Sequence, residues 1–564
     1  MKFSELSYNR PDLDKLEQKY TELLMAFSGA GSFEEQHSYF MEMVKLEKDL
    51  MTQAVLCNIR YTVNTQDKFY EEENDFWDEN SARMAALGHS QVSAILASPY
   101  LENFREVYGD HFVDSALLQL KTFKEEIMED LVEESQWASK YQKLMASVQI
   151  PFQGQDRTLS EMGVFLENPD RDVRKSAGEA TFGFFSDNLD QFDEIYDQLV
   201  RIRHGIAKKL GYENFVQLGY DRMGRTDYNH EDVALYRQGV RDFLVPLVEK
   251  IYKEQEKRLG LDKLYYYDLT YEYPTGMPKP QGDSEFIIDQ ARKMYDELSP
   301  ETSDFFQMML DRELMDLLSK KGKAPGGYCT YLENESVPFI FANFNGTIGD
   351  VNVLTHEFGH AFQVYSARNI PIPSQRFPGM ESAEIHSMGM EFITWPWMEN
   401  FFGQDTEKFF YSHAAGALSF IPYGVLVDHF QHEVFENPEM TPQERRAKWR
   451  ELEKIYMPWK DYGGFEYLEE GGFWQKQLHI YGMPFYYIDY TLAQIVALQI
   501  FKRSREDRDK LWEDYKKICE VGGSLPFLKI LEEGGFESPF DPKVVRDTVD
   551  YLEDFLKGFD TSRF

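Results

Sequence analysis

The sequence predicts a large, mainly α protein with two helical lobes and a small β-sheet. Its 564 residues are 42% hydrophobic and 15% aromatic, which is enough apolar surface for an extensive core. Apolar side chains recur at helical spacing along most of the chain, as at Leu13, Leu16, Tyr20 and Leu23. Stretches rich in β-branched and aromatic residues are few and short, so strands are a minor part of the fold.

The first part of the chain has the pattern of long antiparallel helices. Residues 12–146 are helical in pattern almost throughout, with breaks near Gly88 and at Ser98-Pro99. Residues 149–159 interrupt this pattern with short apolar arms around Gly154, which predicts a small hairpin. Helices resume at Ser160 and continue to Leu210, where Gly211 ends the last one.

The predicted domains are an N-terminal helical lobe at residues 1–190 and a second lobe at residues 191–564, which we expect to hold the functional site. The boundary is soft, because no Gly-, Ser- or Pro-rich linker separates the two parts. We therefore expect the lobes to share helices.

Two later segments are predicted as strands. Residues 265–273 are aromatic and β-prone and end at Pro274. Residues 337–344 form a short apolar run that ends at the turn signal Asn345-Gly346. Asp350 follows this turn and is a good N-cap for the next helix.

That next helix, within residues 352–367, carries the motif His356-Glu357-Phe358-Gly359-His360. In a helix, His356 and His360 lie one above the other on the same face, so both rings can bind one zinc ion. Glu357 lies about 100° round the helix, where its carboxylate can reach a water on that ion without binding the ion itself. The spacing predicts two metal ligands and one general base.

A catalytic zinc ion needs a third protein ligand and one open position. After the motif, several prolines end the helix and a second helical stretch begins near Met380. Three acidic residues share one face of that stretch: Glu381, Glu384 and Glu391. We predict Glu384 as the third ligand, because it lies one turn into the helix, whereas Glu381 suits an N-terminal helix charge.

The neighbouring polar residues have other predicted roles. Glu391 has two possible roles that the sequence leaves open. It can accept a hydrogen bond from a ligating histidine, or it can be solvated or cap the helix. His386 lies two residues from Glu384 and points away from that face. His429 and His432 have an order that matches neither zinc signature, so we interpret them as a structural helix face.

These residues together resemble a known family. The motif, followed by Ala383-Glu384, is similar to the oligoendopeptidase F and Pz-peptidase branch of the thimet oligopeptidase family of zinc metallopeptidases. The segment Gly326-Gly327-Tyr328 stands in the position of the glycine-rich loop of that family. The segment from His479 to Tyr490 resembles its downstream cluster of histidine and tyrosine.

The resemblance implies a deep central channel and a zinc oligoendopeptidase that cleaves internal bonds of short, unstructured peptides, with one Zn²⁺ per chain. It assigns catalytic roles to Glu357, as general base, and to His479 and Tyr490, as donors to the transition state. Four residues are expected to contact the substrate: Gly327, Tyr328, Tyr481 and Tyr486. The alternative for the tyrosines is an ordinary aromatic helix face.

Two other functions remain open from the sequence. One is a zinc carboxypeptidase on a similar helical frame, which would trim peptides from the C-terminus. The other is a non-catalytic helical scaffold that binds peptides and in which the motif is incidental. The strand at residues 337–344 has two readings as well: its edge pairs with an extended substrate, or the strand is buried without such a role.

Composition predicts the surroundings of the protein. A net charge of -37 argues against nucleic acid or an anionic membrane as a partner. The three cysteines are far apart, which indicates a reducing compartment. No signal peptide is visible, and no apolar run approaches the roughly 18 residues of a membrane span. We therefore expect a cytoplasmic protein with no membrane partner, and no feature indicates an oligomeric state.

Overall fold

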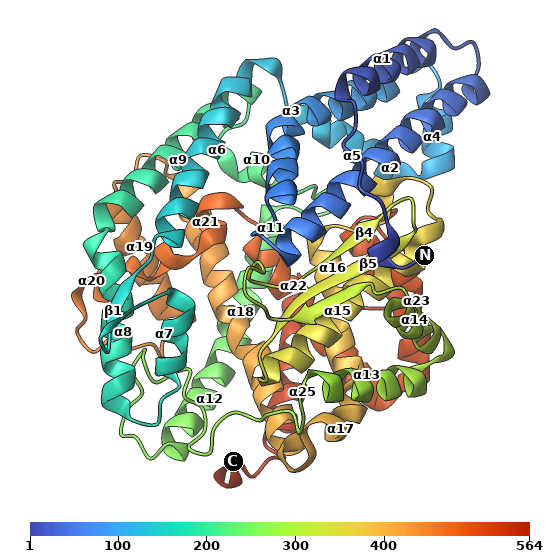
Figure 1. The fold of residues 1–564 in the computed structure, drawn as a ribbon. Helices are drawn as coiled ribbons and strands as arrows, with labels where there is room; N and C mark the ends of the chain where they lie inside the picture. Colours follow the sequence, from blue (N-terminus) through green and yellow to red (C-terminus); the bar gives the residue numbers. More distant parts are fainter. The chain divides into compact units, whose positions relative to one another are not determined.

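The structure, a computed structural model, describes all 564 residues and is mainly α, as the sequence predicts. Helices account for most of the chain, and the strands form two small sheets of two and three strands. Figure 1 shows the succession of helices from the N-terminus to the C-terminus.

The chain divides into two compact units, each built from three segments. Unit 1 contains Met1–Lys121, Pro278–Thr406 and Val496–Phe536, and unit 2 contains Thr122–Met277, Glu407–Ile495 and Glu537–Phe564. The sequence boundary near residue 190 stays a prediction; it falls at the start of α9 (Leu189–Leu210), inside unit 2. The predicted central channel stays a prediction as well.

The N-terminal helices of unit 1 form a bundle. They are α1 (Leu13–Gly29), α2 (Phe33–Val63), α3 (Lys68–Leu96), α4 (Leu101–Tyr108) and α5 (Asp110–Lys121). The predicted break at Ser98-Pro99 is confirmed, since it lies between α3 and α4, but the break predicted near Gly88 is wrong, because Gly88 lies inside α3. Asp12 caps the first helix by accepting a hydrogen bond from the Lys15 amide. The rings of Phe27, Phe40 and Phe104 pack in the core of this bundle, where all three are buried.

Unit 2 begins with a second set of helices. These are α6 (Met128–Ala146), α7 (Leu159–Leu166), α8 (Arg171–Asp187), α9, α10 (Phe215–Arg222), α11 (His230–Gly239) and α12 (Val245–Arg258). The hairpin predicted at residues 149–159 is confirmed: β1 (Ile150–Phe152) pairs antiparallel with β2 (Gln155–Arg157). Gly154 turns the chain between them with φ +78°, a conformation that glycine adopts without strain.

The strand prediction for residues 265–273 is wrong, because this segment forms turns. The buried carboxylate of Asp268 accepts hydrogen bonds from the Arg171 and Arg174 guanidinium groups, each at 2.7 Å. It also accepts one from the Tyr265 amide at 3.0 Å. A turn centred on this carboxylate therefore replaces the ladder that the β-prone composition favours.

The three-stranded sheet lies in unit 1 and has the order β3-β5-β4. Its strands are β3 (Met315–Leu318), β4 (Tyr328–Leu332) and β5 (Val337–Phe344). The predicted strand is β5, which pairs parallel with β3 and antiparallel with β4. It is the central strand and nearly all of it is buried. The free-edge interpretation of β5 is therefore wrong; an edge paired with no strand belongs to β4.

The motif helix α15 (Ile348–Ser366) packs against this sheet and against α16 (Met380–Ile393) (Figure 1). Its apolar side stacks Phe358 on Tyr295 of α13 (Ser284–Leu298), with ring centroids 3.7 Å apart. Asp350 is not its N-cap, because Thr347 occupies that position. The Asp350 carboxylate lies in the first turn and accepts hydrogen bonds from the amides of Asn345 and Gly346.

The remaining helices complete the two units. In unit 1 they are α14 (Pro300–Asp311), α17 (Met398–Phe402), α23 (Arg508–Val521) and α24 (Phe527–Gly534). In unit 2 they are α19 (Pro442–Tyr456), α20 (Glu466–Glu469), α21 (Leu478–Gly482) and α25 (Pro542–Leu556). The helices α18 (Thr406–Glu436) and α22 (Tyr487–Glu506) contain residues of both units.

One helical stretch, Met380–Glu436, is long and apolar enough to cross a membrane, with a mean hydropathy of 1.2 in its most apolar window. Of that window 61% is buried inside the protein. A buried core helix meets the same two criteria, so this stretch is only weak evidence for a membrane span.

Candidate active site

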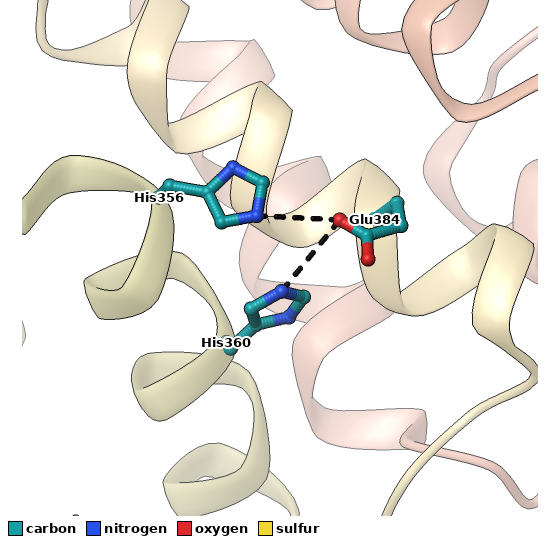
Figure 2. Close-up of side chains that lie close together, drawn as sticks. All are labelled: His356, His360 and Glu384. Atoms are coloured by element: carbon teal, nitrogen blue, oxygen red, sulfur yellow. Dashed lines mark ion pairs between the residues drawn. The ribbon is translucent and has the colours of Figure 1, made fainter. Parts of the chain in front are cut away.

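Two neighbouring helices of unit 1 bring three metal-ligand side chains together (Figure 2). The Oε2 atom of Glu384, on α16, lies 3.3 Å from His356 Nε2 and 3.6 Å from His360 Nε2, both on α15. The ligand atoms of the three residues all lie within 4.8 Å of one another. The structure therefore assembles the predicted donor set of two imidazoles and one carboxylate.

The close approach of α15 and α16 depends on Gly359, which the sequence analysis did not single out. A Cβ atom at Gly359 would lie 2.4 Å from the carbonyl oxygen of His386 and 2.7 Å from Ser387 Cα. Any side chain there would push the α16 backbone, and Glu384 with it, away from the two imidazoles. A glycine inside a helical motif, where it costs about 1 kcal/mol against alanine, was the available signal.

Hydrogen bonds hold two of the ligands in place. His356 Nδ1–H donates to Glu391 Oε1 at 2.8 Å, which keeps a proton on Nδ1 and makes Nε2 the nitrogen that can give its lone pair to a bound metal. Of the two readings left open for Glu391, the structure shows the histidine partner. Ser387 Oγ donates to Glu384 Oε2 at 2.9 Å, a contact that helical spacing alone did not reveal.

The ionisation of the ligands follows from burial and from these contacts. Burial alone would lower the pKa of His356, but its hydrogen bonds to Glu384 and Glu391 raise that pKa well above the usual value. Burial lowers the pKa of His360 to about 4. Burial would raise the pKa of Glu384, but its contacts with the two histidines lower it. The cluster therefore combines a carboxylate with imidazoles, the donors that Zn²⁺ prefers.

Glu357 lies beside this cluster and is 7% exposed. Its Oε2 atom is buried and accepts no hydrogen bond. Burial raises the pKa of Glu357 to about 7, against partial compensation from His356. A buried carboxylate without a structural partner is costly, so its presence points to a use in chemistry.

The glycine-rich segment lies next to Glu357. A Cβ atom at Gly327 would be 3.5 Å from Glu357 Oε1, and Gly326 has φ +94°. Tyr328 begins β4, stacks on Phe341 at 4.7 Å and shares a hydrogen bond of 2.7 Å with Thr62. Gly327 is thus exposed beside the predicted base, whereas both the ring and the hydroxyl of Tyr328 have protein partners.

The other histidines considered in the sequence lie outside the cluster. His386 is fully buried and its Nδ1 hydrogen-bonds to the Ser382 carbonyl oxygen at 2.7 Å. His429 contacts Tyr456, and His432 contacts Tyr220 and Asp428. No second group of three converging metal-ligand side chains occurs in the chain.

His479 and its tyrosines form a separate aromatic cluster in unit 2. The ring centroid of His479 lies 5.5 Å from that of Tyr486 and 6.0 Å from that of Tyr490, and these two tyrosines are 4.9 Å apart. Burial lowers the pKa of His479. His479 Nδ1 hydrogen-bonds to Gln477 Nε2 at 2.8 Å, a partner that the sequence analysis missed.

Tyr481 does not fit the substrate contact predicted for it. Its side chain is fully buried and stacks on Tyr141 with centroids 3.9 Å apart. Trp474 stacks on the same ring at 5.6 Å. Tyr481 is therefore a core residue of unit 2, and the aromatic-face alternative applies to it.

Phe485, which lies between Tyr481 and Tyr486 in the sequence, has φ +65°. Such left-handed geometry is rare for a bulky residue and persists only where its surroundings hold it. The Phe485 amide donates to Gln431 Oε1 at 3.0 Å, and its carbonyl accepts from Arg225 at 2.5 Å. Its ring fills space that Gly219 leaves open, because a Cβ there would lie 2.4 Å from the ring.

Helices that carry a His-Glu-x-x-His motif and a downstream glutamate define the class of zinc-dependent peptidases. Within that class, this chain belongs to peptidase family M3: the family model matches residues 164–548, and the model of the M3 N-terminal domain matches residues 3–123. The family match contains both the metal cluster and the His479 cluster. The predicted family is confirmed.

Solved structures and curated relatives agree with this family. A structure of Pz peptidase A with an inhibitor is 50% identical over all of both chains, with a TM-score of 0.93. A structure of an oligoendopeptidase F from Bacillus anthracis str. Ames is 46% identical over 100% of this chain and 99% of that one, with a TM-score of 0.89. Oligopeptidase PepF of Bacillus subtilis (strain 168) is 22% identical over 70% of this chain.

The match to curated relatives is partial in length. It spans 59% of the Bacillus subtilis oligopeptidase PepF and 62% of an oligoendopeptidase F homolog from Borreliella burgdorferi. This chain therefore matches about three fifths of the length of those proteins.

Proposed function

We propose that this protein is a zinc-dependent oligoendopeptidase that hydrolyses internal bonds of short, unstructured peptides. The observation that carries the proposal is the convergence of His356, His360 and Glu384 beside the buried Glu357, in a chain of peptidase family M3. The named relatives are oligopeptidases and oligoendopeptidases, which supports endopeptidase activity over the carboxypeptidase and scaffold alternatives.

One zinc ion per chain would be held by His356 Nε2, His360 Nε2 and the Glu384 carboxylate. The donor set fits zinc, because two imidazoles and one carboxylate make up a known catalytic zinc site. When bound, the ion supplies Lewis acidity, which lowers the pKa of water and polarises a peptide carbonyl group. Glu391 orients His356 for this role by fixing its proton on Nδ1.

Glu357 is the proposed general base. Its Oε2 atom has no hydrogen-bond partner within the protein and can take a proton from water. The same carboxyl group can then return this proton to the nitrogen of the leaving amine. Burial keeps the group away from bulk water between these two events.

The chain offers two kinds of substrate contact in this proposal. His479 and Tyr490 would donate hydrogen bonds to the oxyanion, with Tyr486 beside the scissile bond. Gly327 and Tyr328 would contact the peptide next to Glu357. An extended peptide would pair with the edge of β4, which no other strand occupies. The cytoplasmic location and the absence of a nucleic-acid partner remain predictions from composition.

A cleavage assay with a metal count tests the proposal. The purified chain would be loaded with zinc, its zinc content measured by elemental analysis, and a peptide blocked at both ends would be digested and mapped by mass spectrometry. We expect one zinc per chain, internal cleavage, and loss of cleavage with a chelator. Trimming from the C-terminus of an unblocked peptide alone would identify a carboxypeptidase, and peptide binding without turnover would identify a scaffold.

A further inference from the structure

His479 is linked to the rest of unit 2 through a chain of two hydrogen bonds. Tyr423 Oη donates to Gln477 Oε1 at 2.6 Å, and Gln477 Nε2 lies 2.8 Å from His479 Nδ1. Gln477 and His479 lie at the start of α21, and Tyr423 lies in the middle of α18. Gln477 is the N-cap residue of α21 and has an extended backbone, and His479 is the second residue of that helix.

We propose that Gln477 is a positioning residue that holds His479 as the neutral tautomer with its proton on Nε2. This tautomer presents Nε2–H as the hydrogen-bond donor. The inference rests on the proposed function for the part that His479 plays in catalysis, but the tautomer itself can be measured without any catalysis.

The orientation of the Gln477 amide decides the tautomer. A side-chain amide offers an oxygen that accepts on one side and a nitrogen that only donates on the other. The only hydrogen-bond partner of the Tyr423 hydroxyl is Gln477. Burial raises the pKa of this hydroxyl well above its usual value, so the hydroxyl is protonated and can donate. With the amide reversed, this proton would have no acceptor, at the cost of an unsatisfied buried donor.

The amide nitrogen of Gln477 therefore faces His479. Because this nitrogen only donates, His479 Nδ1 must accept and cannot carry the proton, which leaves the ring proton on Nε2. Burial lowers the pKa of His479, so the neutral ring is favoured. The side chains packed on the ring are those of Tyr486, Tyr487 and Tyr490, and no ion pair joins His479 to a carboxylate or a cation.

This arrangement gives a donor that does not depend on protonation. A histidine paired with a carboxylate offers Nε2–H only while it is an imidazolium, and it loses that donor as the pH rises through its pKa. A histidine that accepts from an amide at Nδ1 keeps Nε2–H at every pH above its own pKa. Gln477 thus makes the donor strength of His479 constant through neutral and alkaline pH.

The first test reads the tautomer directly. The zinc-loaded protein would be labelled with ¹⁵N-histidine, and the His479 signals would be assigned by their loss in His479→Gln. We expect the wild-type Nδ1 signal to be that of an unprotonated nitrogen and the Nε2 signal that of a protonated one. In Gln477→Glu the proton should move to Nδ1. A protonated Nδ1 in the neutral wild-type ring would overturn the proposal.

The second test is the pH profile of kcat/KM. In Gln477→Glu the new carboxylate raises the pKa of His479, and Nε2–H is present below that pKa and lost above it. We expect kcat/KM of this variant to fall as the pH rises through the new pKa, to a value on the order of 100-fold below that of wild type. Most of this fall should be in kcat and less of it in KM. A profile parallel to that of wild type, in a variant with full zinc content, would contradict the proposal.

Tyr423→Phe provides a second variant in case Gln477→Glu does not fold. Without the hydroxyl, the amide is free to reverse, and we expect His479 signals from both tautomers. Tyr467→Phe is the matched control, because Tyr467 Oη lies 2.7 Å from the Gly472 carbonyl oxygen and 2.9 Å from Gln475 Oε1, so the change removes a buried hydroxyl beside a glutamine that has no hydrogen bond to His479. A mixed tautomer in Tyr467→Phe as well would show that the effect is not specific to Gln477. An Nε2–H tautomer in a chain that cleaves no peptide would leave this inference intact and remove the proposed function.

Discussion

Two histidines in two regions of this molecule are fixed through the same nitrogen by opposite partners. His356, in unit 1, donates from Nδ1 to the carboxylate of Glu391, which leaves an Nε2 lone pair for a metal. His479, in unit 2, accepts at Nδ1 from the amide of Gln477, which leaves an Nε2–H for donation. The partner behind the ring, not the ring itself, decides whether an imidazole serves as ligand or as donor.

The largest effect on zinc binding and on cleavage is expected from removing Glu384, the carboxylate that both ligating histidines face. Glu384→Ala leaves two imidazoles without their third partner, and we expect loss of the zinc ion and of all measurable peptide cleavage. Elemental analysis and the cleavage assay measure the two effects. Glu399→Ala, at an exposed carboxylate of unit 1, is the control and should keep both. Full zinc content in Glu384→Ala would contradict the ligand assignment.

The next largest effect is expected at Glu357, which takes part in neither histidine pair. Glu357→Gln keeps the shape of the side chain and removes its ability to take a proton. We expect normal zinc content and a fall in kcat of about 10²–10⁴-fold. Comparable turnover in this variant, with zinc bound, would assign the base elsewhere.

Replacing the Glu391 carboxylate by an amide gives His356 the kind of hydrogen-bond partner that His479 has. In Glu391→Gln the side-chain amide can either accept from or donate to His356 Nδ1, so the neutral ring can carry its proton on either nitrogen. The Nε2 lone pair is then available to the metal only part of the time. We expect zinc affinity, measured by competition with a chelator, to fall about 10–100-fold. The exposed Glu520→Gln is the control. An unchanged affinity in Glu391→Gln would mean that the carboxylate does not set the tautomer of His356.

The smallest effect is expected on stability, from the backbone that brings Glu384 to the histidines. Gly359→Ala places a Cβ 2.4 Å from the His386 carbonyl oxygen, and we expect the free energy of unfolding to fall by about 1–3 kcal/mol, with weaker zinc binding. Gly416→Ala, in α18, meets nothing within 4 Å and should instead gain up to about 1 kcal/mol from helix propensity. Denaturant unfolding measures both. Equal changes in the free energy of unfolding of the two variants would show that the close contact between α15 and α16 is not the cause.

The features that the sequence predicted well are those that local spacing encodes. The separation of His356 and His360 by four residues places both on one helix face, and the position of Glu384 one turn into the next helix places it opposite them. The bundle helices and the hairpin around Gly154 followed in the same way from periodicity and turn residues. Each of these predictions rests on the pattern of one short segment, except that Glu384 reaches the two histidines only because α16 packs on α15.

The features that the sequence did not predict depend on contacts between distant segments. The central place of β5 follows from its pairing with both β3 and β4, which no single strand pattern reveals. Tyr481 is buried by Tyr141, and the segment of Tyr265 is bent by Asp268 and its two arginines. Gly359 and Gln477 were missed because their roles concern a neighbouring backbone and a neighbouring amide, which spacing does not describe.

The fit of the Phe485 ring over Gly219 ties together two positions that are far apart in the chain. A larger residue at 219 would collide with the ring, and a smaller residue at 485 would leave a void beside Tyr220 and Phe435. Exchange at either site alone is therefore penalised, while a simultaneous exchange can conserve volume. Among related chains, positions 219 and 485 should therefore vary together. Wherever position 219 is glycine, position 485 should be phenylalanine.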